Sequence, residues 1–181
     1  MQNLPSDELA RLSRLMKWLC VTALAALLAT AFYIGVRLLA EGGPFLATIA
    51  PISFDPTLVK RWQIAGIMTV NGIGVWLLSL ALLSLRDMFS QFALGNVLSS
   101  APARSMRSAG RYFLVGAAWS ILAHSVTVLL ATASNAPGER ALAISFSSQQ
   151  LFPLLLAGTL FAVGHLLSEA IRLDQENKSF V

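Results

Sequence analysis

The sequence predicts an all-α protein, an integral membrane four-helix bundle with both termini in the cytoplasm. Only 12% of the 181 residues are charged and 56% are apolar, whereas about a quarter of the residues of a soluble domain are charged. The apolar residues gather in four long runs rather than in short periodic stripes. Most basic residues fall in the segments that four membrane passes would place on one side.

Four segments are long and apolar enough to cross a bilayer. A hydrocarbon core of about 30 Å requires about 20 helical residues, because an α-helix rises about 1.5 Å per residue. The segments that meet this length are residues 16–40, 62–85, 112–134 and 146–171. The last is the least apolar, since it begins near Gln149 and Gln150 and contains Pro153. These segments fill more than half of the chain, so residues 1–181 are expected to form a single membrane domain.

The basic residues predict the orientation of the chain. Four passes place the N-terminus, the middle loop and the C-terminus on one side. That side holds most of the basic residues: Arg11, Arg14, Lys17, Arg86, Arg104, Arg107, Arg111, Arg172 and Lys178. The other side holds Arg37, Lys60, Arg61 and Arg140. Because cytoplasmic loops are enriched in Lys and Arg, we expect a multi-pass protein of the bacterial inner membrane with both termini inside.

Three segments beside these runs are expected to extend or precede the membrane helices. Leucines recur at helical spacing in residues 7–15, which predicts a short amphipathic helix lying in the cytoplasmic interface. The second membrane helix is predicted to continue to Leu94 and stop at Gly95, because glycine is common just after a helix C-terminus. The fourth is predicted to continue through residues 167–177 on the cytoplasmic side.

The first external loop, residues 41–60, is expected to cap the outer end of the helices. Gly42, Gly43 and Pro44 predict the end of the first helix, since Gly and Pro interrupt helical structure. Apolar side chains that would suit packing against the helices follow at Phe45, Leu46, Ile49, Ile52 and Phe54. The alternative is a lid over a ligand or partner.

Polar residues inside the predicted spans are candidate sites, because polar groups in hydrocarbon are costly and often functional. They are Asn71, Ser120, His124 and His165. Asn71 lies about nine residues, or roughly 14 Å, from the outer end of its helix. His124 lies at a similar depth, so the two side chains are expected to come within hydrogen-bonding reach across the bundle. Gly116, Ser120 and His124 share one helix face. The small residues on this face would allow another helix to approach closely.

Two interpretations of His124 stay open at this point. A neutral histidine could join helices by hydrogen bonds, and a titrating one could serve a proton-coupled site. A haem held by both histidines is not expected, because His165 lies nearer the cytoplasmic end by about 10 Å along the membrane normal. Trans ligands of one haem would lie at nearly equal depth.

No enzyme chemistry is expected from the sequence. The only cysteine, Cys20, lies inside the first apolar run, so the chain has no internal disulfide. There is no His-x-x-x-His pair, no Gly-x-Ser-x-Gly turn and no phosphate-binding loop. We therefore expect no catalytic residue, no metal site and no cofactor.

The cytoplasmic arginines Arg104, Arg107 and Arg111 are spaced to share one helix face. They suit attraction to anionic lipid headgroups, worth about 1 kcal/mol per charge. A nucleic-acid role is not expected, because no recognition motif accompanies them and the net charge is only +4.

Two cytoplasmic segments resemble a known family. The first comprises residues 89–98 (FSQFALGNVL) and 103–110 (ARSMRSAG), and the second is the tail 166–177 (LLSEAIRLDQEN). Both resemble the bacterial membrane proteins of domain-of-unknown-function family 2975. That family has a pattern like G-x-x-F … A-x-x-L-R-x-x-G between helices two and three, and E-x-x-x-L-x-x-E-N at the end. This chain has Leu98 where the family tends to have Phe, and Met106 where it tends to have Leu.

The resemblance implies four helices, a bacterial inner membrane and no assigned activity. Members are often encoded beside a small helix-turn-helix regulator, which suggests a cytoplasmic protein partner. The candidate residues for contact with a partner or with lipid are Gly95, Arg104, Arg107, Gly110, Arg111, Glu169, Glu176 and Asn177.

Three functions are compatible with these features. The first is a non-enzymatic membrane protein that binds a partner, such as that regulator, through its cytoplasmic loop and tail. The second is a small homo-oligomeric transporter or channel with a polar path at Asn71 and His124. The third is an accessory subunit of a larger membrane complex.

Overall fold

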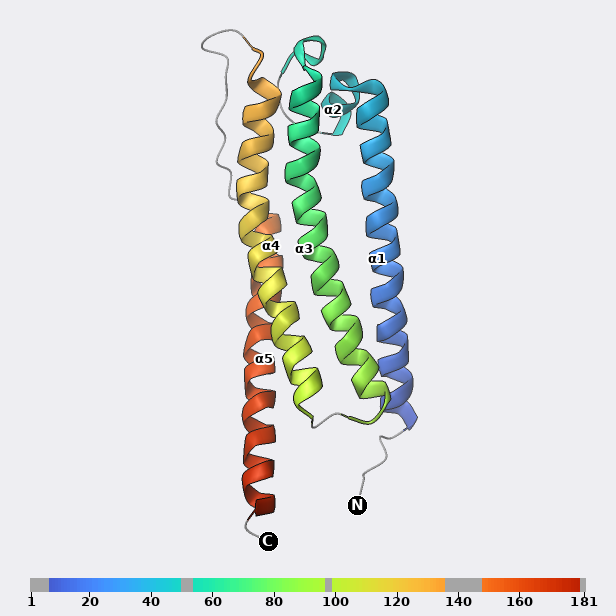
Figure 1. Cartoon of the computed structure of the whole chain (residues 1–181), viewed down its shortest axis with the longest axis vertical. Helices are drawn as coiled ribbons and strands as arrows, with labels where there is room; N and C mark the ends of the chain where they lie inside the picture. The colour runs from blue at the N-terminus through green and yellow to red at the C-terminus, as the bar shows by residue number, and fades with distance from the viewer. Residues whose placement is uncertain (1–6, 50–53, 97–98, 136–147, 180–181) are drawn as a thin grey trace.

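The computed structural model describes residues 7–49, 54–96, 99–135 and 148–179, without the side chains of residues 7, 148–153 and 174–179. In this part of the chain the structure is all-helical (Figure 1). Its elements are α1 (Asp7–Glu41), α2 (Gly43–Ile49), a 3-10 helix η1 (Pro56–Leu58), α3 (Arg61–Ala93), α4 (Ser100–Thr132) and α5 (Ser148–Ser179).

Four of these helices, α1, α3, α4 and α5, are long and apolar enough to cross a membrane. Each overlaps one of the four predicted runs over most of its length, so the prediction of four membrane-spanning helices is confirmed at the level of length and composition. The largest difference is in α4, which begins at Ser100 rather than near Tyr112. Both described ends of the chain and the α3–α4 connection lie at the same end of the molecule (Figure 1).

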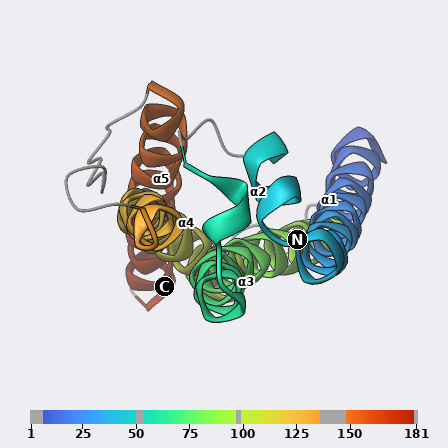
Figure 2. The same cartoon turned by 90° about the horizontal axis from the view of Figure 1, so that it is seen from above.

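The four long helices form an open row rather than a closed bundle. Each packs on its neighbour in the chain: α1 on α3, α3 on α4, and α4 on α5. Among the described residues, α1 has no comparable contact with α4 or α5. Seen from above, the row is curved, and α2 lies on its concave side (Figure 2). The outer faces of α1 and α5 therefore have no partner within the described chain.

The separate N-terminal interfacial helix is not present in the structure. Residues 7–15 are helical, but they belong to the single 35-residue helix α1. No Gly or Pro interrupts residues 7–34, so the backbone hydrogen bonds continue without a break into the membrane span. The leucines at positions 9, 12 and 15 are exposed on this continuous helix.

The predicted end of the second membrane helix is confirmed. Gly95 has a positive φ of 82°, a conformation that glycine adopts without strain. The backbone N–H of Gly95 donates to the Phe92 carbonyl at 3.0 Å, and that of Asn96 donates to the Gln91 carbonyl at 3.1 Å. This is a Schellman end, which satisfies carbonyls that the helix leaves free.

The loop after α1, which was predicted to be external, caps one end of the long helices, as expected, and part of it forms the short helix α2. Gly42 makes the turn from α1 into α2 with a φ of 64°. Phe45 and Leu46 of α2 are buried in a core with residues of α1, α3 and α4, namely Leu38, Ile64, Ile67 and Ala131. A Cβ atom on Gly43 would lie 1.9 Å from the Pro56 carbonyl oxygen, so α2 and η1 touch backbone to backbone. Ile52 lies outside the described residues.

Arg37 joins the outer end of α1 to α2. Its guanidinium lies 5.0 Å from the ring centroid of Phe45 and 5.8 Å from that of Tyr33. Its Nη1 donates to the Tyr33 hydroxyl at 3.1 Å, and its Nε lies 2.7 Å from a carboxylate oxygen of Glu41. Cation–π contacts of this kind are worth about 0.5–1 kcal/mol at exposed sites. They favour one orientation of α2 at the outer end.

The helices α4 and α5 approach closely at two glycines. A Cβ on Gly110 would lie 2.9 Å from the backbone nitrogen of Phe161. A Cβ on Gly164 would lie 2.8 Å from Cγ of Arg107. Small residues at a crossing allow two backbones to pack tightly within a membrane, so these two positions determine how α5 sits on α4.

Candidate functional site

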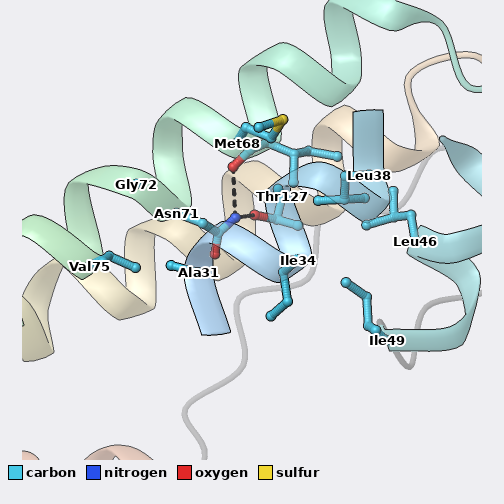
Figure 3. A pocket seen from close by; sticks show the side chains of 12 residues that line it. Ala31, Ile34, Leu38, Leu46, Ile49, Met68, Asn71, Gly72, Val75 and Thr127 are labelled. Atoms are coloured by element: carbon cyan, nitrogen blue, oxygen red, sulfur yellow. Dashed lines mark hydrogen bonds between the residues drawn. The ribbon is translucent and has the colours of Figure 1, made fainter. Parts of the chain in front are cut away.

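A cavity that we call the outer pocket lies between α1 and α3 beneath α2. Its volume is about 450 Å³, within the range of about 300–1,000 Å³ that small-molecule sites occupy. Its walls are mostly apolar side chains of α1, α2 and α3, such as Ile34, Leu46 and Met68 (Figure 3). The polar side chains in its wall are Asn71 of α3 and Thr127 of α4.

Within the described part of the chain, the side chain of Asn71 forms a hydrogen bond with Thr127 and none with His124. Its Nδ2 donates to the Ile67 carbonyl at 2.8 Å and to Thr127 Oγ1 at 3.2 Å (Figure 3). The predicted bond across the helices therefore exists with a different partner. His124 lies one turn before Thr127 in α4 and lines a pocket with Asn71, without a hydrogen bond to its amide.

A second pocket of about 230 Å³ adjoins the first along the α3–α4 contact. Asn71 and Thr127 line both pockets, and His124 and Ser120 line the second. Trp119 closes one side, where its Nε1 donates to the Val70 carbonyl at 2.9 Å. Three of the four predicted intramembrane residues thus come together here.

The predicted helix interface along Gly116, Ser120 and His124 is only partly correct. Gly116 faces α3, since a Cβ there would lie 3.9 Å from Cβ of Leu77. Ser120 is exposed and donates to the carbonyl of Ala117 in its own helix. His165 is exposed on α5 and lines neither pocket.

The three arginines of α4 that were predicted to be cytoplasmic divide into two kinds. Arg104 and Arg111 are exposed on α4, and Arg111 donates to the Ser108 hydroxyl at 3.3 Å. Arg107 is half-buried against Gly164 of α5. It lines a hollow of about 190 Å³ between α4 and α5, together with Arg172. Sequence spacing alone had placed all three α4 arginines on one exposed face.

The other predicted cytoplasmic residues have different surroundings. Gly95 serves as the end of α3, and Gly110 is buried beneath α5, so a direct partner contact through Gly110 does not fit this arrangement. Glu169 pairs with Arg172 at 2.5 Å, as the spacing of three residues suggested. The side chains of Glu176 and Asn177 lie outside the described residues, as do those of Gln149 and Gln150.

Gln63 is a site residue that sequence reasoning missed. It is fully buried near the start of α3. Its Oε1 accepts from the Lys60 backbone N–H at 2.6 Å and from the Ser134 hydroxyl at 3.0 Å, and its Nε2 donates to the Leu130 carbonyl at 2.6 Å. One side chain thus caps the start of α3 and the end of α4. A glutamine at the third position of a helix was the only available signal.

Comparisons with models of protein families, with curated proteins and with solved structures give no match. Within the described residues, no three His, Cys, Asp or Glu side chains are grouped so that they could hold a metal ion.

Proposed function

We propose that this chain is a non-enzymatic protein of the bacterial inner membrane that binds a protein partner at its cytoplasmic end. In this proposal both termini face the cytoplasm, and the partner presents an acidic surface to α4. The resemblance to the family described above suggests a small helix-turn-helix regulator as that partner.

The observation that supports the proposal most is the exposed, rigidly held pair Arg104 and Arg111. Both side chains are exposed on α4, which begins at Ser100 and carries them on regular helix instead of loop. The close approach of α5 at Gly110 and Gly164 fixes this part of α4. Preorganised charges lose less entropy on binding than charges on a flexible loop.

The helix α5 adds a second wall to the same surface. It continues past the start of α4 at the end of the molecule where both described ends of the chain lie (Figure 1). An acidic partner seated against Arg104 and Arg111 would therefore lie beside this projecting part of α5. Complementary charges would speed and orient its docking.

The orientation is tested by labelling single cysteines. In a Cys20→Ser background, Thr57→Cys lies at the outer end and Ser99→Cys lies in the α3–α4 connection. On intact spheroplasts we expect a membrane-impermeant maleimide to label Thr57→Cys, and to label Ser99→Cys only after permeabilisation. The opposite labelling pattern refutes the cytoplasmic placement of the arginines.

The partner is tested by affinity capture of the full-length chain from its native membranes with cross-linking. We expect Arg104→Ala with Arg111→Ala to reduce recovery of a cytoplasmic protein at least several-fold. The matched control is Lys60→Ala with Arg61→Ala, which removes two exposed charges at the other end. Equal recovery with both double variants contradicts the proposal. Lost binding to anionic vesicles with unchanged protein recovery would assign the arginines to lipid headgroups.

A second candidate function is transport by an oligomer, and the shared wall of the two pockets favours it. Asn71 and Thr127 line both cavities, so polar groups run from the outer pocket to His124. If His124 serves a proton path, proton flux into proteoliposomes should fall to the background rate in His124→Ala. Flux that is unchanged in this variant excludes a role of the histidine.

A further inference from the structure

The outer pocket contains a polar pair whose hydrogen-bonding capacity is only half used. Both amide hydrogens of Asn71 are engaged, one by the Ile67 carbonyl at 2.8 Å and one by Thr127 Oγ1 at 3.2 Å. The carbonyl of Ile67 can only accept, which fixes the nitrogen of the amide on that side. Oδ1 of Asn71 is therefore the atom left, and it accepts no hydrogen bond from the described residues.

Thr127 complements this free acceptor with a free donor. Its Oγ1 accepts from Asn71, so its own hydroxyl hydrogen is available. Within the described part of the chain that hydrogen reaches no acceptor, unlike the hydroxyl of Thr69, which donates to the Ala65 carbonyl at 2.8 Å. The pocket thus offers one hydrogen-bond acceptor, Oδ1 of Asn71, and one donor, the hydroxyl of Thr127, on two side chains that contact each other.

The position of this pair makes an unfilled acceptor costly. Asn71 is exposed in the structure, and it lies ten residues after Arg61, the first residue of α3, or roughly 15 Å along the helix. That depth is near the middle of the hydrocarbon, where an unpaired polar group costs several kcal/mol. A bound group that hydrogen-bonds to Oδ1 would remove this cost.

We propose that the outer pocket binds a membrane amphiphile that carries a hydroxyl group on a long hydrocarbon chain. The hydroxyl donates to Oδ1 of Asn71 and accepts from the hydroxyl of Thr127. The chain lies along the apolar wall formed by α1 and α3. No charged side chain lines the pocket, so an ionised headgroup would have no partner there.

The same hydrogen bonds distinguish this ligand from other lipids. A plain hydrocarbon chain leaves the acceptor of Asn71 unpaired. A ketone or ester carbonyl can accept from Thr127 but has no hydrogen to donate to Oδ1. Only a group that both donates and accepts uses both atoms.

Glycines give the pocket its space on both walls. Gly72 of α3 lines it, and a Cβ there would have no atom within 4 Å. Gly35 of α1 lies opposite, where a Cβ would be 3.4 Å from Cε of Met68. A large side chain at position 72 would therefore fill the pocket without a clash against the backbone.

The test uses the full chain in phosphatidylcholine nanodiscs and the quenching of its tryptophan fluorescence by brominated probes. The probes are a bromo-alcohol, a bromo-alkane and a bromo-acyl methyl ester of equal chain length, each corrected for quenching in nanodiscs with free tryptophan analogue. Two hydrogen bonds of modest strength predict that the alcohol binds about tenfold more tightly than the alkane. The ester, which can form only the bond from Thr127, should bind with an affinity between the two.

Three variants separate the site from general partitioning into lipid. Asn71→Leu should abolish the preference for the alcohol, and Gly72→Leu should weaken the binding of all three probes. Ser79→Ala, whose hydroxyl donates only to the Val75 carbonyl of its own helix, should behave as the unmodified protein. Equal affinity for alcohol and alkane, or a preference for the alcohol that persists in Asn71→Leu, overturns the proposal. If Asn71→Leu does not fold, Thr127→Val should still reduce the preference, and an unchanged preference there also refutes it.

Discussion

Replacing Gly110 by alanine should loosen α5 from α4, because the added methyl group would meet backbone atoms. Its Cβ would lie 2.9 Å from Phe161 N, 3.2 Å from the Ala157 carbonyl oxygen and 3.2 Å from Phe161 Cα. No rotamer change can move these atoms, so α5 itself must shift by about 0.5 Å to reach an ordinary contact of 3.4 Å. Overpacking of this kind costs about 1–3 kcal/mol.

The matched control is Gly158→Ala on α5, where a Cβ would meet nothing within 4 Å. Alanine is favoured over glycine in a helix by up to about 1 kcal/mol, so this variant should be equally or more stable. Because both variants gain this helix propensity, we expect their free energies of unfolding to differ by the overpacking cost alone, about 1–3 kcal/mol. The measurement is SDS titration in mixed micelles followed by far-ultraviolet circular dichroism. Equal stability of the two variants would refute the inferred α4–α5 contact.

Three further predictions concern the outer end. Gln63→Leu should lower the free energy of unfolding by about 2 kcal/mol, since it leaves buried backbone groups unpaired. The control Thr69→Val loses one hydrogen bond within its own helix and should change the free energy of unfolding by less than about 0.5 kcal/mol. Similar losses in the two variants would contradict the bridging role of Gln63. Gly43→Ala should expose amides of α2 to hydrogen exchange, because its Cβ would collide with a carbonyl of η1, and unchanged protection would argue against that contact. Hydrogen bonds from the Thr57 hydroxyl, and then from its backbone N–H, hold the pKa of Asp55 below its ordinary value. The carboxyl carbon of Asp55 should therefore titrate at a lower pH in the folded protein than in the unfolded chain. Thr57→Val should raise the midpoint of this titration. Because the folded pKa is the lower one, this turn is stabilised above the ordinary pKa and loses that stabilisation as the pH falls through the folded value.

Local features were predictable because each depends on residues close in the sequence. The four apolar runs, the continuation of α3 to its end at Gly95 and the capping role of the loop after α1 are all present in the structure. The short interfacial helix expected at residues 7–15 is instead part of the single helix α1, because amphipathic spacing indicates which face is apolar and not whether a helix stops. Residues 7–34 contain no Gly or Pro that would interrupt the helix.

The sequence by itself determined where helices run, which ends carry the positive charge and which polar residues lie deep in the spans. The tertiary structure alone decided that Asn71 bonds Thr127, that Gln63 reaches Leu130 across 67 positions, and that Gly110 faces α5. The physical reason is that a period of about 3.6 residues fixes neighbours within one helix. The rotation and crossing angle of each helix against the next depend on packing of side chains far apart in the chain.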